Sequence, residues 1–206
     1  MRDDTQSNDI LPKYNAIAER YSAHDYANAE RYYARRAQLV ARGLEGGASV
    51  LDIACGDGGL GRALLDLGFD YHGVDASTGM VEVARRALGD RVVQGSFDYE
   101  PTEAVDATTI FRSLYLVPDR RAFLERVRGY TKRKLVFDFD PRAYSTNDVR
   151  SDLRAAGWER VELRPFLLPQ RASLPAPLQA ALYALEPLPG ARLITRVRFP
   201  LLVSAF

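Results

Sequence analysis

The segment from Val50 to Gly61 constrains the fold of this chain more than any other. It reads VLDIACGDGGLG, an apolar run that breaks into a glycine-rich turn. A strand can end in so tight a turn only where side chains are absent, and Gly56 and Gly58 allow a positive φ and a close approach to a ligand. Asp75 follows Gly56 by 19 residues, at the predicted end of the next strand, where it can accept hydrogen bonds from ribose hydroxyls. The segment therefore predicts a strand, a nucleotide-cradling turn, a helix and a second strand that ends in an acid.

The spacing of the glycines does not by itself identify the ligand. Gly56, Gly58 and Gly61 fit a G-x-G-x-x-G pattern that binders of dinucleotides and of other adenosine cofactors share. Asp52 is more informative, because an acid inside a buried strand is costly unless it is paired or hydrogen-bonded. A carboxylate there would repel a pyrophosphate beside the turn, which argues against a nicotinamide dinucleotide. The alternative interpretation is that Asp52 only caps the turn.

Residues 51–58, LDIACGDG, resemble the first motif of the class I S-adenosylmethionine-dependent methyltransferases. In that motif an acid within an apolar strand is followed by a small residue and two glycines. The resemblance implies that Asp52 stands near the ammonium end of S-adenosylmethionine, directly or through water. It also implies a sheet of seven strands, mostly parallel with one reversed, and S-adenosylhomocysteine as the product of the cofactor.

Composition indicates a single domain, 1–206, without a strong electrostatic preference. Lys and Arg total 28 against 27 Asp and Glu, so we expect neither nucleic acid nor an anionic membrane as partner. The paired arginines at 35–36 and 85–86 are interpreted as solvated helix faces. The acidic N-terminus is not a secretory signal, and no apolar run approaches the ~18 residues of a membrane span, so we expect a cytoplasmic protein. Cys55 is interpreted as a packing residue, and no cluster has the spacing of metal ligands.

Apolar periodicity along the chain predicts an α/β, doubly wound, Rossmann-like fold. Two helices over residues 10–43 form an N-terminal helical cap that Gly43 closes. The predicted strands are 49–54, 70–74, 91–94, 106–111, 134–139, 158–166 and 197–206, and the predicted helices between them are 59–67, 77–88, 119–129 and 146–156.

An apolar insert at 165–190 separates the last two predicted strands. It carries Leu174, Leu178, Ala181, Leu182 and Leu185 at helical spacing. Three interpretations remain open: a helix packed on the flank of the sheet, a lid or apolar wall over a substrate pocket, and a dimer face. The chain is accordingly expected to be a monomer or a homodimer.

The N-terminal segment from Tyr14 to Tyr21 resembles the Tyr-x-x-x-Ala-x-x-Tyr helix that precedes the core of small-molecule methyltransferases. Residues seven apart share a helix face, so Tyr14 and Tyr21 can act together. The resemblance implies that they close over the methionine end of the cofactor, and simple core packing is the alternative. His24 is the only histidine expected near the chemistry, because His72 lies in the second strand and is expected in the core.

The segment after the third strand departs from the family pattern. Ser96 stands where the family usually carries the acid that receives the adenine amino group. A hydroxyl can still accept that hydrogen bond, although more weakly than a carboxylate. Adenine recognition is therefore expected to rest on Ser96, on Asp98 or on the backbone, with Phe97 against the ring.

Residues 111–119 follow the fourth strand and are similar to the family's post-strand motif. By that similarity Arg112 and Tyr115 point toward cofactor and substrate, and Asp119 caps the next helix. A surface salt bridge is the alternative for Arg112. Tyr115 replaces a frequent histidine, which removes the obvious general base.

One further spacing is interpreted as chance. Tyr130 and Lys134 match the Tyr-x-x-x-Lys pair of short-chain dehydrogenases. That pair must share a helix face, whereas Gly129 is expected to end the helix and Lys134 to start a strand.

These observations predict methyl transfer from S-adenosylmethionine to an O, N or C atom of a small hydrophobic or aromatic metabolite. The alternatives are a protein that binds this cofactor for a task other than methylation, such as a cyclisation, and an NAD-dependent oxidoreductase. The candidate catalytic residues are Tyr21, His24 and Tyr115. The candidate cofactor-binding residues are Tyr14, Tyr21, Asp52, Ala54, Cys55, Gly56, Gly58, Asp75, Ala76, Met80, Ser96, Phe97 and Arg112.

Overall fold

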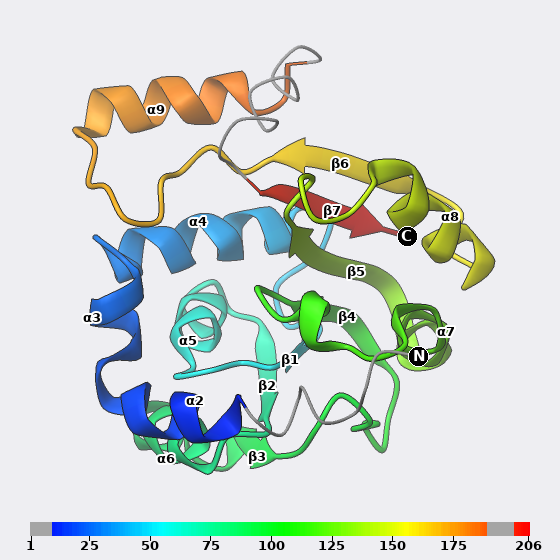
Figure 1. The fold of residues 1–206 in the computed structure, drawn as a ribbon, viewed down its shortest axis with the longest axis horizontal. Helices are drawn as coiled ribbons and strands as arrows, with labels where there is room; N and C mark the ends of the chain where they lie inside the picture. Colours follow the sequence, from blue (N-terminus) through cyan, green and yellow to red (C-terminus); the bar gives the residue numbers. More distant parts are fainter. Residues whose placement is uncertain (1–9, 189–199) are drawn as a thin grey trace.

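The computed structural model describes residues 10–188 and 200–206 as one mixed sheet with helices on both faces (Figure 1). The start of the last predicted strand, 197–199, and the end of the predicted insert, 189–190, lie outside the described residues. The strands are β1 Ser49–Ile53, β2 Asp70–Asp75, β3 Val92–Gln94, β4 Val105–Ile110, β5 Thr131–Phe139, β6 Val161–Pro165 and β7 Leu201–Ala205. Their order is β3-β2-β1-β4-β5-β7-β6, and β7 runs antiparallel to both of its neighbours. The predicted fold class is confirmed.

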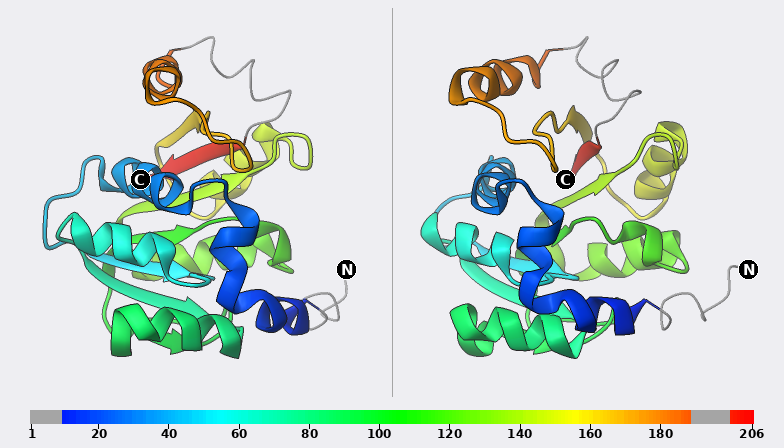
Figure 2. Two further views of the ribbon diagram at one scale, coloured as in Figure 1. Left: turned by 90° about the vertical axis from the view of Figure 1, so that its left-hand side faces the viewer. Right: turned by 60° about the vertical axis from the view of Figure 1, so that its left-hand side comes forward.

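The sheet is doubly wound, because helices cover both of its faces (Figures 1 and 2). The helices α4 Ala29–Ala41, α5 Gly59–Asp66 and α6 Thr78–Leu88 contribute to one apolar core. The helices α7 Arg120–Tyr130 and α8 Thr146–Ala155 contribute to the other. Asp119 caps α7 as predicted, since its carboxylate accepts from the backbone N–H of Ala122 at 3.0 Å. The strand order reverses between β1 and β4, which is where open sheets of this kind bind ligands.

The N-terminal cap differs from the predicted pair of helices. It consists of α2 Leu11–Ile17, a 3-10 turn η1 Ala18–Arg20 and α3 Tyr21–Asp25, followed by α4. Figure 1 shows α2 and α3 running in different directions, so one continuous helical face is wrong. The bend follows from tertiary contacts: the side chain of Asn15 accepts from Ser77 Oγ at 2.7 Å and from the N–H of Gly79 at 3.0 Å. Ser22 of α3 donates to Asp57 in the glycine turn.

The predicted insert contains one helix, α9 Ala176–Leu185, which lies beyond α4 (Figure 2). Leu178 and Leu185 are 50% and 39% exposed, whereas Tyr183 packs against the core that α4 contributes to. Glu186 is buried in an ion pair with Arg35, whose guanidinium lies 4.1 Å from the ring of Tyr183. The predicted apolar stripe is therefore only partly covered, and the packed-flank interpretation of the insert stays a prediction.

Two smaller expectations also change. The side chain of His72 is exposed rather than in the core, because β3 begins to pair with β2 only at Gly73. Helix α7 continues through Gly129 to Tyr130, and β5 begins at Thr131. Lys134 therefore lies inside a strand, where its Nζ donates to the carbonyl groups of Leu39, Val40 and Arg42 at the end of α4. This position supports chance as the explanation of the Tyr130–Lys134 spacing.

No helix in the described ranges 10–188 and 200–206 is long and apolar enough to cross a membrane.

Candidate functional site

The glycine turn after β1 takes the left-handed backbone that its sequence predicts. Gly56 and Gly58 have φ of 58° and 75°, and Ala54 has a φ of 58° although it carries a side chain. A Cβ on Gly58 would lie 2.5 Å from Leu88 Cδ1, so Gly58 permits the close packing of α6 on the turn. Gly58 lines none of the hollows described below, whereas Gly56 and Ala54 line two of them.

Asp75 connects the ends of β1 and β2. One carboxylate oxygen accepts from the N–H of Gly56 at 2.8 Å, and the other accepts from the N–H of Ser77 at 2.9 Å. Burial raises the pKa of Asp75, while the two backbone N–H groups act in the opposite direction. The carboxylate is thus fixed in place by backbone, with remaining lone pairs that can accept from a ligand's hydroxyls.

A hollow of about 190 Å³ opens at this carboxyl end of the sheet. The predicted cofactor residues that line it are Tyr14, Tyr21, Ala54, Gly56, Asp75, Ala76, Met80, Ser96, Phe97 and Arg112. The residues that the prediction missed are Ile10, Leu11, Phe111, Ser113 and Leu116. The hollow, called here the adenosine hollow, combines apolar walls with one fixed carboxylate that can accept hydrogen bonds, an arrangement that fits a purine nucleoside.

The residues after β3 divide between the hollow and the surface. Ser96 lines the adenosine hollow, and its hydroxyl accepts from the N–H of Asp98 at 3.2 Å. Asp98 points elsewhere, since it is exposed and pairs with Arg126 at 3.1 Å. Phe97 also lines the hollow and packs edge-to-face on Phe123, with ring centroids 6.2 Å apart. Of the two side chains considered for the adenine amino group, only Ser96 faces the hollow.

Asp52 lies deeper, beside a second and much smaller hollow of about 30 Å³, the methionine-end hollow. Its carboxylate accepts from Thr109 Oγ1 at 2.6 Å and from Tyr71 Oη at 3.2 Å, which provides the hydrogen-bond partners that a buried acid requires. Burial raises the pKa of Asp52 to about 7. Cys55 lines the same hollow, and burial raises the pKa of its thiol, in agreement with a packing role.

A buried arginine that sequence reasoning missed completes the methionine-end hollow. Arg36 is fully buried rather than solvated; its Nη2 donates to Asp138 Oδ2 at 2.5 Å, and its guanidinium lies 4.4 Å from the ring of Phe111. Arg35 is buried as well, against the prediction of a solvated face. The sequence did contain one signal for the burial of Arg36. This residue follows Tyr32 by one helical turn, within a stripe of the helix that is otherwise apolar.

Arg112 joins the cap to the end of β4. Its φ is 58°, a strained value for a residue with a side chain, and its N–H donates to Asp138 Oδ1 at 2.6 Å. Its guanidinium donates to Tyr21 Oη at 3.0 Å, to Tyr26 Oη at 2.9 Å and to Asp25 Oδ2 at 2.7 Å. The salt bridge considered for Arg112 exists, but it lies within the site rather than at the surface. Asp25 and Tyr26 carried no sequence signal for this role.

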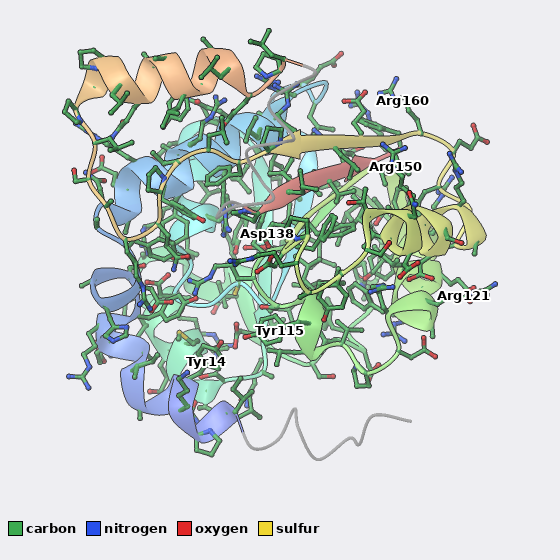
Figure 3. All side chains as sticks on the ribbon, turned by 45° about the horizontal axis from the view of Figure 1, so that its top comes forward. Tyr14, Tyr115, Arg121, Asp138, Arg150 and Arg160 are labelled. Atoms are coloured by element: carbon green, nitrogen blue, oxygen red, sulfur yellow. The ribbon has the colours of Figure 1, made fainter. Side chains whose placement is uncertain are left out.

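The predicted tyrosines meet although the helix between them bends. The rings of Tyr14 and Tyr21 are edge-to-face at 6.2 Å, and the hydroxyls of Tyr14 and Tyr115 share a hydrogen bond of 3.4 Å (Figure 3). Tyr115 lines a further hollow of about 370 Å³, the acceptor hollow, which shares Arg112 and Ser113 with the adenosine hollow. The remaining lining residues of the acceptor hollow are Tyr32, Leu114, Asp138, Phe139, Asp140, Arg142, Ala143, Tyr144, Gln170 and Pro200.

His24 is not brought to these hollows. Its side chain is 59% exposed, and its Nδ1 is 2.9 Å from Asp25 Oδ1. Through Asp25 it is linked to Arg112, so its connection to the site is indirect. Within the described part of the chain, no group of three or more His, Cys, Asp or Glu side chains could hold a metal ion.

Comparisons with known proteins agree with this geometry. A family model described as a methyltransferase domain matches residues 50–134, which contain the glycine turn and β1 to β4. No curated protein matches the chain.

Solved structures share the fold at low identity. Magnesium protoporphyrin IX methyltransferase from Synechocystis PCC 6803, crystallised with bound S-adenosylmethionine, is 18% identical over 100% of this chain and 97% of its own, with a TM-score of 0.67. A possible histamine N-methyltransferase from Thermotoga maritima is 14% identical over 95% and 98%, with a TM-score of 0.64. A putative methyltransferase in complex with the Trm112 methyltransferase activator of Haloferax volcanii is 21% identical over 100% and 98%, with a TM-score of 0.63.

Proposed function

We propose that this protein, an S-adenosylmethionine-dependent methyltransferase of the class I fold, transfers a methyl group to a small aromatic or hydrophobic acceptor held in the acceptor hollow. The observation that carries the proposal is that two hollows at the carboxyl end of the sheet share wall residues. The adenosine hollow and the acceptor hollow meet at Arg112 and Ser113. The walls at that meeting point would bring a cofactor and an acceptor together, and positioning is a large part of such a reaction.

The residues of the first two hollows suit the parts of the cofactor. Asp75 would accept from the ribose hydroxyls, Ser96 would receive the adenine amino group, and Phe97 would pack against the ring. At the methionine end, Asp52 offers a carboxylate for an ammonium group, and Arg36 and Arg112 offer guanidinium groups for a carboxylate. When bound, S-adenosylmethionine supplies a methyl group activated by a positively charged sulfur.

The acceptor hollow favours an aromatic or hydrophobic molecule. Tyr32, Tyr115, Phe139 and Tyr144 contribute aromatic surface to it. The charged residues that line it already have partners: Asp138 binds Arg36 and the N–H of Arg112, Arg112 binds Asp25, and Asp140 binds Arg142 at 2.6 Å. Helix α9 does not line this hollow, and the insert contributes Gln170 to it instead of its apolar stripe.

Proton removal is not assigned to a residue of this site. The nearest hydroxyls stay protonated near neutral pH and so cannot take up a proton, because burial and the neighbouring Tyr115 raise the pKa of Tyr14, and burial raises the pKa of Tyr21. The nucleophilic atom of the acceptor would therefore already be deprotonated when the acceptor binds, as in a phenolate or an uncharged amine. The contribution of Tyr14, Tyr21 and Tyr115 is to exclude water and to orient the acceptor.

The test is incubation of the protein with S-adenosylmethionine and a panel of single-ring phenols and aryl amines, followed by mass spectrometry. Formation of S-adenosylhomocysteine in equal amount to a methylated product supports the proposal. Tyr144→Ala should reduce turnover while calorimetry shows unchanged affinity for S-adenosylhomocysteine, because Tyr144 lines only the acceptor hollow. Consumption of the cofactor without a methylated product would instead support a non-methylating task such as cyclisation.

A further inference from the structure

A large hollow lies at the other edge of the sheet from the proposed methyl-transfer site. Its volume is about 610 Å³, and it is bounded by the end of α4, the first residues of β6 and the last residues of β7. In Figure 3, Arg160 at this edge and Tyr14 of the cap lie on opposite sides of the view. None of its lining residues also lines the adenosine, methionine-end or acceptor hollow. We call it the amino-edge hollow.

The lining of the amino-edge hollow carries more positive than negative charge. Its cations are Arg42, Lys134, Arg160 and Arg164, and its acids are Glu162 and Glu186. Both acids already have partners: Glu186 binds Arg35 and accepts from the N–H of Leu167, and Glu162 lies 3.4 Å from Arg160. Among the residues that the structure describes, Arg42 and Arg164 form no salt bridge within 4.0 Å.

Arg164 provides the most specific signal. The side chain is only partly buried, but one of its nitrogens, Nη1, is buried and lacks a hydrogen-bond partner within the described residues. A buried charged donor without an acceptor is costly, and such a group in a native protein calls for a partner. Burial and the neighbouring Arg42 lower the pKa of Arg164. Burial is the main reason that the pKa of Lys134 falls to about 8; Glu162 acts in the opposite direction, and Arg42, Arg164 and Arg160 lower the pKa further. An anion in the hollow would relieve this mutual repulsion.

The hollow also has an apolar wall. Leu39, Leu202 and Phe206 contribute to it, and Leu188 lines it from the segment after α9. Lys134 does not offer free donors to a ligand, because its Nζ already donates to three carbonyl groups at 2.9 to 3.2 Å. The donors left for a ligand are the guanidinium groups of Arg42 and Arg164, whose fork geometry suits the oxygens of a phosphate.

We propose that the amino-edge hollow is a second ligand site that binds a phosphate monoester with an aromatic or apolar body. Arg42 and Arg164 hold the phosphate, and the leucine wall holds the body. The volume lies within the range typical of small-molecule sites, and the two unpaired guanidinium groups match the two negative charges of a phosphate monoester. The site does not depend on the proposed methyl transfer.

The experiment is calorimetric titration of phenyl phosphate into the protein saturated with S-adenosylhomocysteine. We expect one site, with at least tenfold tighter binding than inorganic phosphate or benzoate. Arg164→Gln and Arg42→Gln should each weaken binding tenfold or more. Arg121→Gln is the matched control, because it removes the same charge from the exposed surface of α7, where Arg121 pairs with Glu125; it should leave binding unchanged.

A second readout uses the lysines, which are only Lys13, Lys132 and Lys134. Nuclear magnetic resonance of labelled lysine should show that phenyl phosphate raises the pKa of Lys134 and leaves that of Lys13 unchanged. Loss of this shift in Arg164→Gln would support the assignment. No saturable binding, equal affinity for inorganic phosphate, an equal loss in Arg121→Gln, or competition by S-adenosylhomocysteine would overturn it.

Discussion

Arg35 and Arg36 are neighbours on α4, but they contact two regions of the molecule that are held in place by different interactions. Arg36 points to the carboxyl end of the sheet, where Asp138 binds both its guanidinium and the N–H of Arg112, and where Phe111 lies under the guanidinium. Arg35 points to α9, where it forms an ion pair with Glu186 and its guanidinium lies over the ring of Tyr183.

The difference concerns how many contacts hold each region. At the carboxyl end of the sheet, Asp52, Arg112 and Asp138 each have several partners from different elements, so the proposed cofactor site is preorganised before a ligand binds. Helix α9 has exposed leucines and few contacts, which places it among the parts of a fold that can open locally at low cost. The following predictions test this contrast, from the largest expected effect to the smallest.

Asp138→Ala should reduce the free energy of unfolding by about 3–5 kcal/mol, because it leaves the buried charge of Arg36 without a partner. Urea denaturation measures the change. Asp138→Asn serves as the comparison, since it retains an acceptor for the N–H of Arg112 and should cost less. A loss below about 1 kcal/mol in Asp138→Ala would mean that Arg36 finds another partner or reaches water, and the contrast with α9 would disappear.

Asp52→Asn should weaken binding of S-adenosylhomocysteine by about 1.5–3 kcal/mol, roughly tenfold or more, if Asp52 receives the ammonium group. Calorimetry at neutral pH measures the loss. Wild-type protein should also release protons on binding near pH 6.5, because an ammonium group lowers the raised pKa of Asp52. The variant should release fewer, as shown by titrations in buffers of different ionisation enthalpy.

The pH dependence of stability in the free protein tests the raised pKa of Asp52 without any ligand. The pKa of Asp52 is about 7 in the folded protein and near 4 when unfolded, so the folded state binds the proton more tightly. Its contribution to stability is therefore present at low pH and is lost as the pH rises through about 4 to 7. Asp52→Asn should gain stability relative to wild type at pH 8 but not at pH 4; equal differences at both would place the pKa near its ordinary value.

Glu186→Gln should cost about 1–2 kcal/mol, less than Asp138→Ala, because α9 can move away and let water reach Arg35. Hydrogen exchange should accelerate over residues 176–185 while affinity for S-adenosylhomocysteine stays within about twofold. Glu19→Gln is the control, since it breaks an exposed ion pair with Arg86 and should not alter exchange in α9. Global unfolding in place of local exchange would contradict the contrast.

Ser96→Ala should weaken S-adenosylhomocysteine binding by about 0.5–1.5 kcal/mol, the smallest effect of the series, because a neutral hydrogen bond is lost at an exposed position. Ser96→Asp should bind at least as tightly as wild type, since a carboxylate makes a stronger bond to the adenine amino group. Calorimetry distinguishes the pair. If neither variant changes the affinity for S-adenosylhomocysteine, the backbone rather than Ser96 recognises the adenine amino group.

Much of the adenosine hollow could be predicted, because its residues follow one another at the ends of consecutive strands. Gly56, Asp75 and Ser96 each stand a fixed number of positions after an apolar run, and parallel strands bring those positions to one edge. Arg112 was found in the same way, but its partners were not. Asp25 lies 87 residues before it in the chain, and a distance of that kind leaves no local pattern to recognise.

The sequence by itself determined the sheet, the glycine turn and the two strand-end acids Asp52 and Asp75, because these depend on periodicities of two and 3.6 residues and on positive φ at fixed positions. The tertiary structure alone decided the bend between α2 and α3, the burial of Arg35 and Arg36, and the exposure of α9. In each case the deciding partner, Asn15 with Ser77, Arg36 with Asp138 or Arg35 with Glu186, lies 62 to 151 residues away along the chain. A charged side chain is buried or solvated according to the partner it meets in space, and helical spacing contains no information about that partner.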